Sequence, residues 1–178
     1  MSFDIYFVAR PVDENWDAAP AAVDPVAGGD GSLSDGDLVV WEQIKATVLD
    51  ELPNASEIVG DQSRYMDDEA LRLQLSMFPT EIRLSVPYWS EGDEAEAEVI
   101  VGLLRRLTGE VEQITDRVGY DPQLDCPFLE GQPRQAVDTF DHVRVVLDEH
   151  AATPAPPSPQ SSAAPPSSKR QRRLFGRS

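Results

Sequence analysis

The amino-acid sequence predicts an α+β fold, a ferredoxin-like split β-α-β arrangement (βαββαβ) with one additional C-terminal helix. The first observation is that 40% of the 178 residues are hydrophobic, which is enough for a single core. The second is that residues 1–150 alternate between short runs of period two, typical of strands, and longer runs with helical spacing. The predicted order is strand, helix, strand, strand, helix, strand, followed by a third helix.

The first strand is predicted over residues 1–10, where apolar side chains recur at every second position from Phe3 to Phe7. The residues between them are also largely apolar, so we expect this strand to be central in its sheet. Residues 11–37 are rich in Pro, Gly and acidic residues and contain no basic residue. This composition predicts a long acidic loop or a lid, with Trp16 as its anchor.

The first helix is expected to be capped by Asp37 and to end before Pro53. Its apolar side chains fall at helical spacing, at Val40, Trp41, Ile44, Val48 and Leu52. A polar stretch, Asp61–Glu69, follows. Residues 71–77 and 82–86 then show alternating apolar and polar side chains on the two sides of a Phe78-Pro79-Thr80 turn, which predicts a β-hairpin.

The second helix is expected to start near Ser90, because Ser90 and Asp93 have the spacing of a capping box. Its apolar positions are Val99, Ile100, Leu103, Leu104 and Leu107. Gly109 is well placed as the C-cap of this helix. The run Val111–Tyr120 then predicts a strand that ends in the sequence Tyr120-Asp121-Pro122-Gln123.

The third helix is predicted from apolar positions at Ala136, Val137, Phe140, Val143 and Leu147. It completes the acidic domain, residues 1–150, near His150. Residues 151–178 are rich in Pro, Ser and Ala and contain no acidic residue, so we expect a disordered tail. The end of this tail is basic, with Lys169, Arg170, Arg172, Arg173 and Arg177.

The formal net charge is −17, and all 32 acidic residues precede the tail. An acidic surface repels phosphate backbones and attracts basic proteins, so we expect no nucleic-acid binding by the domain and a basic protein as its partner. The alternative is that the acidity only keeps the protein soluble. The basic tail can contact RNA, an anionic membrane or an acidic protein face; the alternative is that it has no dedicated role.

The sequence contains none of the fixed-spacing motifs for metal ions, nucleotides or nucleophilic catalysis, so we expect no catalytic residues, no metal and no cofactor. Its two histidines, His142 and His150, have no visible nucleophile beside them. Cys126, the one cysteine, is interpreted as an ordinary thiol. Without a signal-peptide pattern or an apolar run long enough for a membrane span, the expected location is the cytoplasm.

The most site-like feature is the aromatic pair Tyr88 and Trp89, which leaves a predicted strand at the entrance to a helix. Such a pair can form the floor of a groove that binds a partner, and Tyr120 with Asp121 is a second candidate of the same kind. The alternative is that the aromatic pair only caps the core and that Tyr120-Asp121 only forms a turn.

The segments Met1–Asp4, Pro87–Trp89 and Tyr120–Gln123 resemble a set of small bacterial proteins of unknown function. Those proteins open with M-S-F/Y-D, carry a strand that ends near P-Y-W, and end their domain with Y-D-P-Q. The resemblance covers roughly residues 1–150 and implies the same domain limits and a bacterial source. It implies no activity and no site residue.

Three functions therefore stay open. The first is a non-enzymatic acidic module that binds a basic protein, for example as an immunity protein that neutralises a toxin. The second is a small hydrolase or transferase that uses Asp or Glu near the aromatic groove. The third is tethering to nucleic acid or to a membrane through the basic tail. Oligomeric state is not specified by the sequence.

Overall fold

The structure is a computed structural model, and it describes residues 2–10, 16, 31–87 and 94–152. It is α+β, as predicted. In chain order the elements are β1 (Ser2–Ala9), α2 (Asp35–Glu51), β2 (Ser56–Val59), β3 (Arg64–Asp68), β4 (Leu73–Met77), β5 (Ile82–Pro87), α3 (Glu94–Thr115), β6 (Arg117–Asp121), β7 (Cys126–Pro127) and α4 (Pro133–Ala152).

The strands form one antiparallel sheet in the order β2-β3-β4-β5-β1-β6-β7. The ferredoxin-like arrangement is not confirmed, because this sheet has seven strands instead of four. The strands that the sequence did not predict are β2, β3 and β7. β3 lies within the polar stretch Asp61–Glu69 and faces the core mainly through Met66. β2 precedes this stretch, and all its residues are exposed, so neither strand shows a clear apolar alternation.

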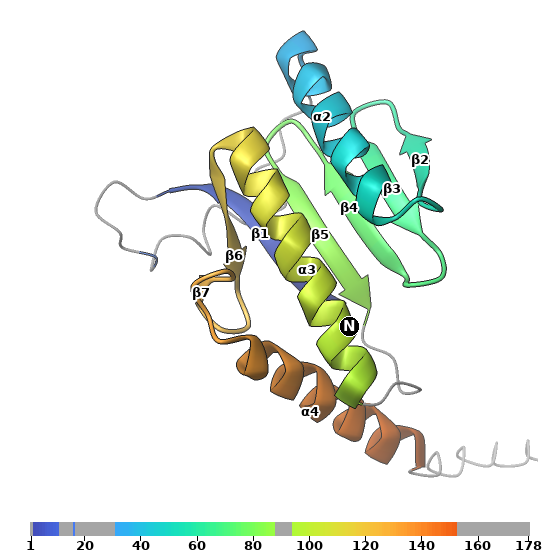
Figure 1. The fold of residues 1–178 in the computed structure, drawn as a ribbon. Helices are drawn as coiled ribbons and strands as arrows, with labels where there is room; N and C mark the ends of the chain where they lie inside the picture. Colours follow the sequence, from blue (N-terminus) through green and yellow to red (C-terminus); the bar gives the residue numbers. More distant parts are fainter. Residues whose placement is uncertain (1, 11–15, 17–30, 88–93, 153–178) are drawn as a thin grey trace, which may run out of the picture.

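The core lies on one face of the sheet, where Phe3, Ile5 and Phe7 of the central strand β1 are buried. Their partners across the ladder with β5 are Val86, Leu84 and Ile82, which are buried as well. Figure 1 shows α2 and α3 side by side across this face, with α4 crossing near one end of α3. The domain thus has two layers, a sheet and the helices that cover its apolar face.

The helix α2 begins three residues earlier than predicted. Its N-cap is Ser34, whose hydroxyl accepts from the backbone N–H of Asp37, while the Asp37 carboxylate accepts from the backbone N–H of Ser34. Asp37 is therefore the second member of a capping box and not the cap itself. The residues from Asp35 belong to this helix, so the loop predicted over 11–37 ends sooner than expected; residues 11–15 and 17–30 lie outside the described part.

The predicted end of the second helix is wrong, because α3 continues through Gly109 to Thr115. Val111 and Ile114, which were assigned to a strand, pack against the core from this helix. The helix ends where Asp116 adopts a left-handed backbone conformation (φ 55°), and the strand β6 starts only at Arg117. Val111 continues the helical spacing of Leu104 and Leu107, and this favours continuation over a stop at glycine.

We expect Gly109→Ala to stabilise the domain by up to about 1 kcal/mol, because alanine has a much higher helix propensity than glycine. A Cβ at this position would meet only Leu129 Cδ1, at 3.8 Å, which is an ordinary contact. Urea unfolding followed by circular dichroism measures the difference. A glycine that capped the helix in a left-handed conformation would give the opposite result, a loss of stability.

The predicted third helix is confirmed as α4, in which Ala136, Val137 and Phe140 are buried. Phe140 stacks on Phe3 with ring centroids 4.8 Å apart, so α4 is packed on the central strand. Within the described ranges, no helix is long and apolar enough to cross a membrane.

Candidate functional site

The predicted site residues are only partly described. Tyr88 and Trp89 lie outside the described residues, as do the tail residues Lys169, Arg170, Arg172, Arg173 and Arg177. The last described residue of β5, Pro87, is paired with Ser2 of β1. Tyr120 is paired with Tyr6, on the other side of β1. The predicted site residues therefore belong to different sides of the central strand β1: Tyr88 and Trp89 come after β5 in the sequence, whereas Tyr120 and Asp121 are part of β6.

Tyr120 is fully buried on the sheet face opposite the main core, where it contacts Val8. Its hydroxyl donates a hydrogen bond to the Asp125 carboxylate, and burial raises its pKa above the usual value. Trp16 stacks on its ring with an interplanar angle of 11°. Trp16, the expected anchor of the acidic loop, is thus in contact with one of the predicted site residues.

Asp121 is also fully buried. Its Oδ1 accepts from the backbone N–H groups of Gln123 (2.8 Å) and Leu124 (3.3 Å), so the side chain holds the turn that follows β6. Its Oδ2 has no hydrogen-bond partner in the part of the chain that the structure describes. Burial raises the pKa of Asp121 to about 6, although the two backbone donors oppose the rise.

Cys126 lies opposite Asp121 in the short ladder between β6 and β7. Burial, and then the negative charges of Asp121 and Asp125, raise the pKa of its thiol. A raised pKa keeps the thiol protonated at neutral pH, which agrees with its interpretation as an ordinary thiol.

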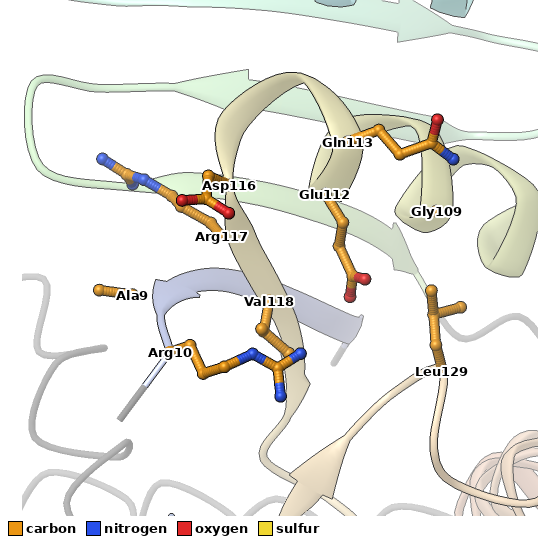
Figure 2. A pocket seen from close by; sticks show the side chains of 9 residues that line it. All are labelled: Ala9, Arg10, Gly109, Glu112, Gln113, Asp116, Arg117, Val118 and Leu129. Carbon is orange, nitrogen blue, oxygen red and sulfur yellow. The ribbon is translucent and has the colours of Figure 1, made fainter. Parts of the chain in front are cut away.

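An open pocket of about 620 Å³, which was not predicted from the sequence, lies between α3 and the edge of β6. Figure 2 shows its side chains, which come from three separate segments of the chain. They are Ala9, Arg10, Gly109, Glu112, Gln113, Asp116, Arg117, Val118 and Leu129. Glu112 was not predicted as a site residue, because the run Val111–Tyr120 was predicted to be a strand and Glu112 belongs to α3.

The pocket forms because β7 is only two residues long and pairs only with Tyr120 and Asp121, so that Arg117 and Val118 of β6 have no strand beside them on the outer edge. At Gly119 the carbonyl accepts from the backbone N–H of Phe128 at 2.7 Å. The opposite wall carries Leu129, in the segment after β7. Arg105 of α3 fixes this segment by donating hydrogen bonds to main-chain carbonyls of Phe128, Leu129 and Gly131, at 2.7 to 3.1 Å. Because the guanidinium of Arg105 is charged, these three hydrogen bonds are strong and hold the segment that carries Leu129 in place.

Glu112 is the central polar group of the pocket. Its Oε1 accepts from the backbone N–H of Gly119 at 2.9 Å, and so satisfies a donor on the open strand edge. Burial raises the pKa of Glu112, whereas the bond from Gly119 and the charge of Arg10 lower it. In Figure 2 the Glu112 carboxylate points toward the side of the pocket where the Arg10 guanidinium lies.

The exposed surface of α2 and α3 is strongly acidic, and we call it the acidic helical face. Its exposed carboxylates are Asp35, Glu42, Asp50, Glu51, Glu94, Glu96, Glu98 and Glu110. The basic residues of the two helices are Lys45, Arg105 and Arg106. Lys45 pairs with Glu42 and Glu57, Arg106 pairs with Glu51, and Arg105 is turned to the carbonyls described above.

The described residues do not include a group of three or more His, Cys, Asp or Glu side chains placed to hold a metal ion. His142 is exposed on α4. Comparison with protein-family models, with curated proteins and with solved structures found no match to this chain. The polar groups of the candidate site are the carboxylates of the acidic helical face and the half-buried carboxylate of Glu112 in the pocket.

Proposed function

We propose that the domain is a non-enzymatic interaction module that binds a basic protein through the acidic helical face. An immunity protein that neutralises a basic toxin is the concrete version of this proposal. The observation that carries it is an excess of negative charge: the face has eight exposed carboxylates, whereas α2 and α3 contain only three basic residues, one of which, Arg105, donates to main-chain carbonyls instead.

The surroundings offset only part of this charge. The exposed basic side chains of the described residues are Arg10, Arg72, Arg106 and Arg134. Arg134 pairs with Glu94, Glu98 and Asp138, and Arg10 pairs with Glu130. A field of one sign over a broad face accelerates encounter with a partner of the opposite sign and excludes nucleic acid and anionic lipid.

The test is capture of partners by the full chain from a lysate of the cells that express it, at low and at high salt, with each captured protein identified. We expect a basic protein that is released at high salt, because the Debye length falls from about 10 Å at 0.1 M to about 3 Å at 1 M. The captured protein is then purified and its dissociation constant is measured. Retention that does not depend on salt contradicts an electrostatic face.

A control distinguishes binding through the acidic helical face from a general effect of the net charge of the protein. Asp50→Lys with Glu110→Lys reverses two exposed carboxylates of the face, whereas Asp61→Lys with Glu69→Lys makes the same change of charge in exposed turns beside β3. We expect the first pair to weaken binding by at least about tenfold. Equal weakening by both pairs shows that only net charge matters.

The second candidate is a small hydrolase or transferase, and the raised pKa of Asp121 is the observation that favours it. This buried carboxylate does not line the pocket described above, so a substrate would have to reach it by another route. Tethering through the basic tail is a third proposal, tested by truncation after Ala152. A ferredoxin-like core, elaborated by β2, β3 and β7, is supported by the order β6-β1-β5-β4 in the middle of the sheet.

A further inference from the structure

We propose that the pocket between α3 and β6 binds the guanidinium group of an arginine side chain carried by the basic partner. This inference rests on the proposed function, because it names the group of the partner that the domain recognises. The acceptor is the Glu112 carboxylate, and the walls for the aliphatic stem of the arginine are Val118 and Leu129.

The dimensions and the lining of the pocket fit such a side chain. Its volume of about 620 Å³ exceeds what one arginine fills, and it is open to solvent, so a side chain can enter from a partner's surface. Leu129 and Val118 offer apolar area for the methylene groups, which arginine buries while its charged end reaches a polar partner. Gln113 adds an amide oxygen at the rim.

Glu112 is prepared to accept a cation. One oxygen, Oε1, is held by the backbone N–H of Gly119, which fixes the direction of the carboxylate. The side chain is only partly exposed, so it is screened less by water than the carboxylates of the acidic helical face. A guanidinium donates two parallel hydrogen bonds to a carboxylate, which gives both strength and orientation.

Arg10 shows that a guanidinium is compatible with the pocket, because it lines the pocket and its charge already acts on Glu112. Its only ion pair among the described residues is with Glu130, at 3.9 Å, and both side chains are more than half exposed. Such a pair contributes little to stability. Arg10 is therefore easily displaced by an arginine that arrives with the binding energy of a whole partner.

The charged lining is balanced, with Arg10 and Arg117 against Glu112 and Asp116, so the placement of these groups decides in favour of a cation. Arg117 also lines it, but its guanidinium is turned toward the carbonyl of Phe7 in β1. Asp116 and the exposed Glu130 add negative charge on the two sides. An anionic ligand would also have to approach through the field of the acidic domain.

The pocket lies on the flank of α3 away from α2. On one side of α3, Arg106 reaches Glu51 of α2, and on the other side Arg105 reaches Leu129 at the pocket wall. A partner that covers the acidic helical face can thus place one arginine around α3 into the pocket. The face then provides attraction over a distance, and the pocket provides one fixed contact.

The experiment uses amide NMR of the full chain during titration with Nα-acetyl-arginine amide. The citrulline analogue is the matched neutral probe, since it has nearly the same shape without the charge. We expect the arginine probe to shift the Gly119 amide resonance in the millimolar range, and the citrulline probe to do so at least about tenfold more weakly. Equal shifts with both probes, or no shift at Gly119, overturn the proposal.

Two variants make the result specific. Glu112→Gln is expected to weaken binding of the arginine probe about tenfold, whereas Glu69→Gln, an exposed change of the same kind outside the pocket and outside the acidic helical face, leaves it unchanged. Arg10→Ala is expected to tighten binding two- to threefold, because it removes a competing guanidinium. Weaker binding in Arg10→Ala overturns the proposal even if Glu112→Gln fails to fold. If the salt-sensitive partner is captured normally by Glu112→Gln, the pocket inference fails and the proposed function stands.

Discussion

Replacing Gly119 by alanine is expected to destabilise the domain by about 2 kcal/mol, as overpacking in a well-packed core does. A Cβ on this residue of β6 would overlap Thr108 Cγ2 of α3 and lie 3.2 Å from Ile5 Cγ2 of β1. The backbone itself allows alanine, because Gly119 does not have a positive φ. At an open position the same change would stabilise by about 0.4 to 1 kcal/mol, so the sign of the result reports the close approach of helix and sheet.

Thr108→Ala is the matched second change. Thr108 is fully buried, and its hydroxyl has no hydrogen-bond partner among the described residues, so its removal alone has a small expected cost. The double variant removes the overlap and should recover more than half of the stability lost in Gly119→Ala. Urea unfolding of the four proteins gives the coupling energy. Additive effects of the two changes would mean that α3 does not rest on β6 at this glycine.

The fold was predictable from sequence where one face of an element is apolar and the other is wet. Strands β4 and β5 were predicted from this alternation, which placed Ile82, Leu84 and Val86 correctly in the core. It could not reveal β2, whose residues are all exposed at the edge of the sheet. Nor could it show where α3 ends, because the side chain that continues the helix, Val111, is as suitable for a strand as for a helix.

The candidate site was less predictable, since it depends on contacts between distant segments. Arg10, Glu112 and Leu129 become neighbours only through the order of the strands and through the hydrogen bonds of Arg105 to the wall of the pocket. Neither the strand order nor the hydrogen bonds of Arg105 can be recognised from a single sequence. Net charge, in contrast, was visible at once, but only the structure shows that eight carboxylates are exposed on α2 and α3, beside only three basic residues in the two helices.

Asp121→Asn is expected to stabilise the domain at pH 8 and to change its stability little at pH 4. In the folded chain burial raises the pKa of Asp121 to about 6, from an ordinary value of 3.8 that applies when the chain is unfolded. Well below pH 3.8 the carboxyl is protonated in both states and does not affect stability, and at pH 4 its effect is still small. Between about pH 4 and pH 7 the folded state holds the proton more tightly, so the free energy of unfolding of the wild type falls as the pH rises.

The size of the effect follows from the same two values. One pKa unit corresponds to about 1.4 kcal/mol, so the difference between 3.8 and about 6 corresponds to a loss of about 3 kcal/mol by pH 8. Asparagine keeps an oxygen for the backbone N–H groups of Gln123 and Leu124 and has no charge to bury. The unpartnered end of its amide adds an offset that does not depend on pH.

The measurement is urea unfolding of both proteins from pH 4 to pH 8, with the difference between them taken at each pH so that the other titrating groups cancel. Asp61→Asn, an exposed change of the same chemistry, is measured in parallel as the control. A flat difference for Asp121→Asn would mean that its carboxylate is solvated in the folded protein. That outcome would also remove the one observation that favours an acid–base enzyme, because a solvated carboxylate has no reason to titrate near neutral pH.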